Sequence, residues 1–324
     1  VGNFSTDGGT IKLDGNYPVG TANVAMGDTA LDSVQAGGTD NVAIGDHAGT
    51  AITTGDKNIA IGSCALEKNT TAGENLAIGQ QALQCNVTGI HNTAIGAGAL
   101  LKNTDCRNVA IGYHSLLCNT SGESNTAIGY NSLDANTTAD NNTAVGTSAL
   151  TANTTGSSNT AVGYVSLFAN TIGTNNTANG WCALGGNTEG VKNTSIGAST
   201  LRCNLTGENN TAVGYISLLK NTASNNTAIG GCALMCNTSG GSNAAVGTNA
   251  LAANTTGANN TAVGYIALCS NTTGGCNVAI GRDALDSNTE GSSNVAVGTD
   301  TLQANTTGGS NIAIGDDALK GNST

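Results

Sequence analysis

The sequence of 324 residues is poor in several residue types that globular proteins use to build cores and charged surfaces. Aromatic residues make up 3% and charged residues 10%, and there are two Phe, one Trp, two Met and one Pro. Typical soluble domains contain about 25% charged residues. A wide core of large side chains is therefore excluded, and a polar surface must come from Asn, Thr and Ser.

The chain also lacks the patterns that indicate nucleic-acid binding or membrane insertion. Lys and Arg number 10 against 21 Asp and Glu, so the formal net charge is −11, and the basic residues are scattered along the chain. No basic stripe exists to neutralise phosphates, so nucleic acid is not an expected partner. No apolar run approaches the ~20 residues that a membrane helix needs, so membrane insertion is not expected.

Residues suited to catalysis or metal binding are equally few. The three histidines, His47, His91 and His114, are far apart in the chain, and none has a partner at the spacing of a zinc site or a catalytic triad. The Gly-x-Gly spacings come from a repeat and do not lie between a strand and a helix, as a phosphate-binding loop would. The sequence predicts a protein that is not an enzyme and has no catalytic residues, metal ligands or cofactors.

What the sequence does contain is a repeat of 17 residues. The segment Asn-x-Ala-Ile/Val-Gly starts eighteen times, from Asn23 to Asn311, and the interval is 17 residues except for 18 after Asn23 and 16 after Asn92 and Asn210. We number each repeat from this Asn as position 1. Seventeen residues suit one coil of a narrow parallel β-solenoid. The sequence predicts an all-β solenoid of about 18 coils, as one elongated domain over 23–324 after a cap segment, residues 1–22.

Positions 2 to 5 predict a short strand followed by a corner. Position 2 is mostly Thr, Val or Ile and position 4 is almost always Ile or Val, and we expect both to point into the core. Because strand side chains alternate between faces, position 3 is then expected to face outward, although it is Ala in every repeat except at Ser195. A small apolar column on the outside predicts a self-association face, represented by Ala127, Ala144 and Ala161.

Three later positions are nearly constant. The invariant Gly at position 5 suits a corner with positive φ. Leu at position 9 occurs in every repeat but one, where Gly49 stands, and it predicts a second short strand that adds Leu to the core. Asn at position 12 recurs in sixteen repeats. Stacked Asn side chains can hydrogen-bond from one coil to the next, so position 12 is predicted to be an internal ladder.

The Asn-x-Ala-Ile-Gly core and its longer form, Asn-Thr-Ala-Val-Gly-Tyr-x-Ser-Leu-x-x-Asn-Thr-Thr-Gly, resemble the head repeat of trimeric autotransporter adhesins, the YadA-like head, and repeats of phage and large-virus fibre proteins. The resemblance covers the chain from Asn23 nearly to its end. It implies left-handed parallel β-rolls, three chains packed side by side and attachment to surfaces. The chain differs in its longer coils and its ten cysteines. Because the motif is structural, it indicates a fold and not an activity.

We therefore expect a structural subunit of an extracellular fibre or filament, a shaft or head segment used for surface attachment and assembled with copies of itself as a trimer or filament. One alternative is a carbohydrate-binding adhesin module that recognises cell-surface glycans. It rests on an aromatic stripe at position 6, whose simpler role is stacking between coils. The candidate ligand residues are Tyr113, Tyr130, Tyr164, Trp181, Tyr215 and Tyr265.

A further alternative is an ice-binding solenoid, which needs two outward columns of Thr two residues apart. Thr at position 2 alternates with Val and Ile, and Thr at position 13 alternates with Val87 and Leu205. Such interchange with apolar residues predicts that both columns face inward. The sequence therefore argues against ice binding.

The ten cysteines predict disulfide bridges and an oxidising, extracellular location in a secreted, cell-surface or virion fibre protein. Two of the pairs repeat one spacing, from position 7 of one repeat to position 11 of the next. The predicted bridges are Cys64–Cys85, Cys106–Cys118, Cys182–Cys203, Cys232–Cys236 and Cys269–Cys276.

N-glycosylation sequons are abundant, but those at position 12 are explained by the Asn ladder. Five others lie just before the repeat motif, in a variable column that we expect to face outward. If the source secretes the chain through an endoplasmic reticulum, these sites are predicted to carry glycans. They are Asn141, Asn175, Asn209, Asn225 and Asn259.

Overall fold

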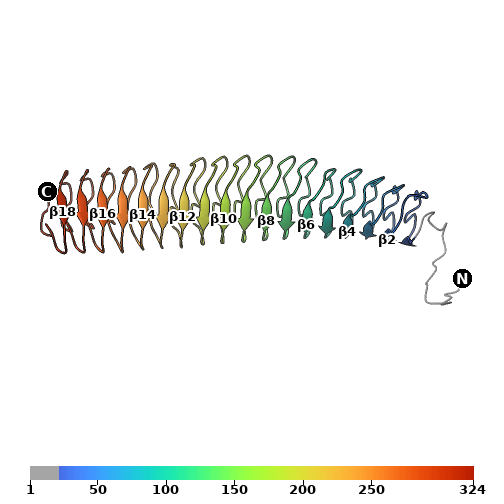
Figure 1. Cartoon of the computed structure of the whole chain (residues 1–324), viewed down its shortest axis with the longest axis horizontal. Helices are drawn as coiled ribbons and strands as arrows, with labels where there is room; N and C mark the ends of the chain where they lie inside the picture. Colours follow the sequence, from blue (N-terminus) through green and yellow to red (C-terminus); the bar gives the residue numbers. More distant parts are fainter. Residues whose placement is uncertain (1–21) are drawn as a thin grey trace. The chain divides into compact units, whose positions relative to one another are not determined.

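The computed structural model describes residues 22–324 and divides the chain into two compact units, Val1–Thr155 (unit 1) and Gly156–Thr324 (unit 2). Its described part is all-β, with eighteen parallel strands of three residues and no helix. Each unit is a β-solenoid with one strand in every coil (Figure 1). The predicted fold class is confirmed. The predicted cap, residues 1–22, lies outside the described residues except for Ala22, and the prediction of one elongated domain stays a prediction.

The strands occupy positions 2 to 4 of the repeat. Unit 1 contains β1 (Val24–Met26), β2 (Val42–Ile44), β3 (Ile59–Ile61), β4 (Leu76–Ile78), β5 (Thr93–Ile95), β6 (Val109–Ile111), β7 (Thr126–Ile128) and β8 (Thr143–Val145). Unit 2 contains β9 (Thr160–Val162), β10 (Thr177–Asn179), β11 (Thr194–Ile196), β12 (Thr211–Val213), β13 (Thr227–Ile229), β14 (Ala244–Val246), β15 (Thr261–Val263), β16 (Val278–Ile280), β17 (Val295–Val297) and β18 (Ile312–Ile314).

Consecutive strands within each unit pair in parallel so that equivalent positions stack on one another. The register survives the two 16-residue repeats, because Thr93 pairs with Val109 and Thr211 pairs with Thr227. The one-residue deletion in these repeats therefore falls in the loop and leaves the strand pairing intact. This stacking turns each column of the repeat into a continuous row of like side chains.

The strand faces are the reverse of those predicted. Position 3 is buried in every strand from β2 to β18, whereas positions 2 and 4 are half-buried or exposed in all of them. Ala127, Ala144 and Ala161 are each 0% exposed within a single chain, so the predicted self-association face at these residues is wrong. They form the core of the coil, because the Ala column packs against the opposite side of its own coil.

One coil shows this packing directly. Ser195, the single exception in the Ala column, is hydrogen-bonded to the hydroxyl of Thr200 and donates to the Thr200 carbonyl oxygen at 3.0 Å. Thr200 is at position 8, where most other repeats have Ala or Ser. Positions 3 and 8 therefore face each other across a narrow core, and only small residues fit where they meet.

The predicted second strand is also wrong, although the burial of Leu is correct. Leu at position 9 is fully buried in nearly every coil but lies in a turn with positive φ, for example +50° at Leu234. Position 7 also has positive φ, as in Cys232 at +59°. Left-handed residues of this kind are costly, and the regular hydrogen bonding between coils offsets the cost.

The corner glycine at position 5 behaves as predicted. Gly180 has a φ of +140°, and a Cβ added there would lie 2.5 Å from the carbonyl oxygen of Gly197 in the next coil. A larger residue would therefore suffer both backbone strain and a clash with a backbone atom that cannot move aside.

Two internal columns of Asn hold the coils together. At position 12, Asn254 donates to the side-chain oxygen of Asn237 at 2.8 Å, which confirms the predicted ladder. A second ladder, which the sequence reasoning missed, lies at position 1. There Asn277 donates to the side-chain oxygen of Asn260 through its backbone N at 2.9 Å and through its side chain at 3.2 Å. Both columns are buried, so each ladder supplies hydrogen bonds shielded from water.

Candidate functional site

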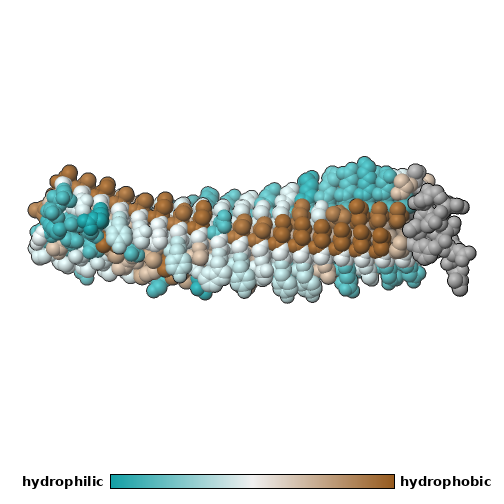
Figure 2. Space-filling model, turned by 90° about the horizontal axis from the view of Figure 1, so that it is seen from below, coloured by the Kyte–Doolittle hydropathy of each residue, from teal (hydrophilic) through white to brown (hydrophobic). Residues whose placement is uncertain are grey.

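The outer side of the strands carries an extended row of apolar side chains in each unit. We call the outward residues at positions 2 and 4 of the strands the strand face. Figure 2 shows its apolar residues as brown bands over β2–β8 of unit 1 and over β11–β18 of unit 2. Position 4 is Ile or Val in every coil except at Met26 and Asn179. Its exposed members include Met26, Ile128, Ile196, Ile229, Val246, Val263, Ile280 and Ile314.

The strand face carries no charge. Positions 2 and 4 hold Thr, Val, Ile, Leu, Ala, Met or Asn in all eighteen repeats, and never Asp, Glu, Lys or Arg. The charged residues lie instead on corners and loops. Because nothing on the strand face opposes contact between two like surfaces, its chemistry suits packing against another apolar sheet and does not suit catalysis.

Sequence reasoning missed the strand face because positions 2, 3 and 4 are all apolar or small. A signal was nevertheless present in position 8, which is restricted to Ala, Ser or Thr. Small residues at both position 3 and position 8 indicate that two sides of the coil pack closely against each other at these positions. This pattern would have predicted that position 3 faces the core. The same correction applies to both Thr columns that were expected to face inward. Position 2 faces outward, and position 13 is half-buried or exposed in every coil, with Val87 39% and Leu205 50% exposed. On the strand face the neighbour of position 2 is the apolar position 4, so this face does not have the two Thr columns that ice binding requires.

The aromatic stripe is exposed but discontinuous. Tyr113 and Tyr130 stack with ring centroids 5.5 Å apart, which confirms stacking between coils at this pair. In unit 2, Tyr164 and Trp181 are 55% and 51% exposed, whereas Tyr215 has no aromatic residue at position 6 of the adjacent coils. Carbohydrate binding by these side chains stays a prediction.

A shallow hollow of about 540 Å³ lies near Trp181. It opens where Gly185 and Gly186 replace the larger residues usual at positions 10 and 11. The guanidinium of Arg202, which also lines the hollow, lies 5.9 Å from the centroid of the Trp181 ring, within the range of a cation–π contact. The other lining residues are Val165, Phe168, Cys182, Cys203 and Leu205.

None of the five predicted disulfides is present, because all ten cysteines are free thiols. Their side chains meet other partners. The Cys106 sulfur accepts a hydrogen bond from the Ile90 backbone N at 3.4 Å, and Cys85 and Cys118 lie against lysines. The unbonded residues are Cys64, Cys85, Cys106, Cys118, Cys182, Cys203, Cys232, Cys236, Cys269 and Cys276.

The five candidate glycosylation sites occupy the outward column that the sequence predicted. Asn141, Asn175, Asn209, Asn225 and Asn259 are all exposed. The sequon residues at position 12, such as Asn136 and Asn153, are 0% exposed and are used in the ladder. The inside and outside assignment of these two columns is confirmed, and glycosylation itself stays a prediction.

The histidines have surface partners and do not form a site. His47 contacts Asp46 at 2.8 Å and the His114 ring stacks on Tyr113 at 3.8 Å. His91 contacts Glu74 at 2.7 Å, and hydrogen bonds from His91 and then Lys57 lower the pKa of the Glu74 carboxyl. Within residues 22–324, no group of three or more His, Cys, Asp or Glu side chains could hold a metal ion.

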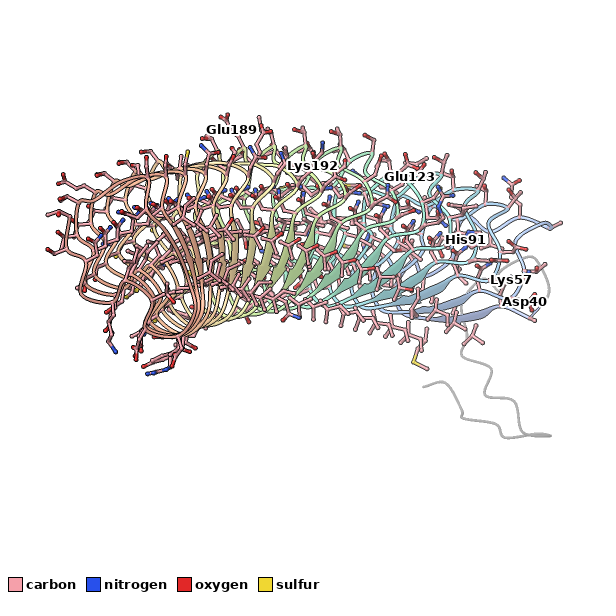
Figure 3. The ribbon with its side chains drawn as sticks, turned by 60° about the vertical axis from the view of Figure 1, so that its left-hand side comes forward. Asp40, Lys57, His91, Glu123, Glu189 and Lys192 are labelled. Atoms are coloured by element: carbon pink, nitrogen blue, oxygen red, sulfur yellow. The ribbon has the colours of Figure 1, made fainter. Side chains whose placement is uncertain are left out.

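Charged side chains gather on the loops instead. Figure 3 shows Lys57, His91 and Glu123 along one edge of unit 1, and Glu189 and Lys192 along an edge of unit 2. Exposed ion pairs on these loops, such as Lys57 with Glu74 and Arg107 with Glu123, contribute little to stability. Their place on the loops keeps charge away from the strand face.

One half-buried carboxyl of unit 1 gives a pH-dependent prediction. Burial raises the pKa of Asp134 above 3.8, and one of its oxygens has no hydrogen-bond partner among the described residues. The folded state therefore binds the proton of this carboxyl more tightly than the unfolded state does. As the pH rises above 3.8 the carboxyl ionises, and the free energy of unfolding decreases. We expect Asp134→Asn to raise the free energy of unfolding by about 0.5 kcal/mol at neutral pH.

Well below the ordinary pKa of Asp the difference should vanish, because the carboxyl is then neutral in both states. Urea unfolding at both pH values measures the effect. The exposed Asp28→Asn is the control and should leave stability unchanged at either pH. A variant less stable than the unmodified chain at neutral pH would contradict the assignment.

Comparisons with known proteins gave no match, either to a family model or to a curated protein. Across residues 22–324, the structure has no helix of the length and apolar character needed to cross a membrane.

Proposed function

We propose that the chain is a structural subunit of an extracellular fibre or filament, and that its copies associate through the strand face. The observation that carries the proposal is an uncharged aliphatic column, outward and partly exposed, along each unit. Parallel sheets are usually covered on both faces, and exposed apolar patches larger than a few hundred Å² mark interaction sites. A second copy of the same face is a fitting cover because its chemistry is the same.

The fold supports a mechanical role. Nearly every coil repeats the same strand pairing and Asn hydrogen bonds, so coils can be added without a change in the cross-section of the solenoid. The likeness to YadA-like head repeats and to fibre repeats of phages and large viruses supports a trimer and surface attachment. An uncharged strand face, and a remaining surface with few charges and many amide and hydroxyl groups, support close packing in an extracellular fibre.

The proposal is tested by placing charge on the strand face. The double variant Val246→Asp and Val263→Asp should remain folded, since both side chains are 37% exposed, but should sediment as a single chain. Association would require burying four or more unpaired carboxylates in each assembly, which costs several kcal/mol. Analytical ultracentrifugation at micromolar concentration measures the state and, for the unmodified chain, the number of copies.

The matched control adds the same charge at position 6 of the same coils. Thr248→Asp and Tyr265→Asp alter exposed corner residues where Asp occurs in other repeats, and should leave association unchanged. An unmodified chain that stays monomeric would refute association through the strand face.

A further inference from the structure

Lysine and cysteine occur together in one column of the repeat. Position 11 holds Lys in three repeats, and in each case position 11 of the following repeat is Cys. The three pairs are Lys68 with Cys85, Lys102 with Cys118, and Lys220 with Cys236. The remaining Cys at this position, Cys203, follows Gly186. The pairing recurs in both units, so it is not a local accident of one loop.

The register of the coils brings the two side chains together. The Nζ atom of Lys68 lies 3.9 Å from the sulfur of Cys85, and that of Lys102 lies 3.8 Å from the sulfur of Cys118. In the third pair the backbone N of Lys220 donates to the carbonyl oxygen of Met235, the residue before Cys236, at 3.3 Å. The backbone thus fixes the same relation between neighbouring coils.

Direct ion pairing does not account for these contacts, although the charge of Lys102 acts at longer range on Asp134, where it partly offsets the rise in pKa that burial causes. None of the ion pairs within residues 22–324 involves Lys68, Lys102 or Lys220. A thiol is a weak hydrogen-bond acceptor, so a lysine ammonium group gains less from a hydrogen bond to sulfur than from one to water. A recurrent and exposed lysine beside a thiol therefore suggests a chemical use for the pair.

We propose that these pairs are modification sites at which oxidation joins the Lys nitrogen to the Cys sulfur and staples adjacent coils. A peroxide first oxidises the thiol to a sulfenic acid and is itself reduced to water or an alcohol. The ammonium releases one proton to solvent, and the neutral amine attacks the sulfur. The sulfur–oxygen bond breaks, a sulfur–nitrogen bond forms, and the oxygen leaves as water with the second amine proton.

The step needs little movement, because nitrogen and sulfur already lie within 4 Å at Lys68 and Lys102. Each bridge closes a loop of one coil and restricts the unfolded chain, as a disulfide of the same span would. It would strengthen the solenoid in an oxidising environment even though no disulfide is formed. The proposal does not depend on self-association through the strand face.

The test uses the reduced full-length chain treated with hydrogen peroxide and digested with trypsin without reductant. Trypsin cuts after Arg107, between Lys102 and Cys118, so a bridge leaves two peptides joined and blocks cleavage after Lys102. Mass spectrometry should detect this joined species, with a loss of two hydrogen atoms. Bridging should be faster at higher pH, because only the neutral amine attacks, and added thiol should reverse it.

Two variants separate the bridge from simple thiol oxidation. In the Lys102→Gln variant, Cys118 should be oxidised further to sulfinic acid, and no joined peptide should form. In the control variant Lys192→Gln, which alters an exposed lysine in another column, Lys102 and Cys118 should still form the bridge. The proposal would be overturned if oxidation of the unmodified chain left Cys118 only in disulfides or as sulfinic acid, and trypsin still cleaved after Lys102.

Discussion

Ala127→Glu is expected to abolish the fold of the solenoid, whereas Ile128→Glu on the neighbouring residue is expected to preserve it. Ala127 is 0% exposed and lies in the narrow space between the two walls of the coil, but Ile128 faces outward and is 36% exposed. A carboxylate at position 127 would be buried without a partner, at a cost of about 4 kcal/mol or more in addition to the clash. Circular dichroism and thermal unfolding distinguish the two variants.

The milder substitution Ala127→Ser provides the control. Position 8 of the same coil is Ser132, and Ser195 shows that a hydroxyl at position 3 can pair with a hydroxyl at position 8. This variant should therefore fold with a small loss of stability. If Ala127→Glu unfolded at the same temperature as the unmodified chain, the inward assignment of position 3 would be untenable.

Asn260→Ser should destabilise the chain by about 3 kcal/mol or more, because the side chain holds three coils together. It donates to the Asn243 side-chain oxygen at 3.2 Å and to the Gly274 carbonyl oxygen at 2.9 Å, and it accepts from the backbone N of Asn277 at 2.9 Å. The shorter Ser cannot reach all of these groups. They would remain buried without partners, and urea unfolding measures the loss.

The adjacent substitution Asn259→Ser is its matched control. Asn259 is exposed and has a φ of +61°, and the preceding coil places Ser242 at the equivalent position with a φ of +60°. The same chemical change should therefore alter the free energy of unfolding by less than about 0.5 kcal/mol. Equal losses for both variants would show that the position 1 ladder contributes no special stability.

The disulfide prediction shows what spacing alone leaves undecided. Cys64 and Cys85 repeat the separation of Cys182 and Cys203, and the sequence identifies both pairs as neighbours in adjacent coils. Cys182 and Cys203 both line the hollow near Trp181, but both are free thiols. Whether sulfur atoms meet depends on the direction of each side chain, and at Cys85 that direction is toward Lys68.

The sequence by itself determined the period of the fold and the contents of its columns. A 17-residue repeat requires equivalent positions to stack, so the Asn ladder at position 12, the Gly corner at position 5 and the loop sites of the 16-residue repeats could all be predicted. These features depend only on translation from one coil to the next. The place of the strand, just before the Gly corner, could also be predicted, whereas the prediction of a second strand at position 9 was wrong.

Only the tertiary structure decided which side of the strand is the inside. Alternation places positions 2 and 4 on one face and position 3 on the other, but all three are small or apolar, so the pattern is symmetric between the two choices. The choice depends on the width of the coil, which is set by Leu at position 9 in a left-handed turn and by small residues at position 8. Because these elements lie across the coil from the strand, the space between them allows Ala at position 3 and excludes Ile and Val.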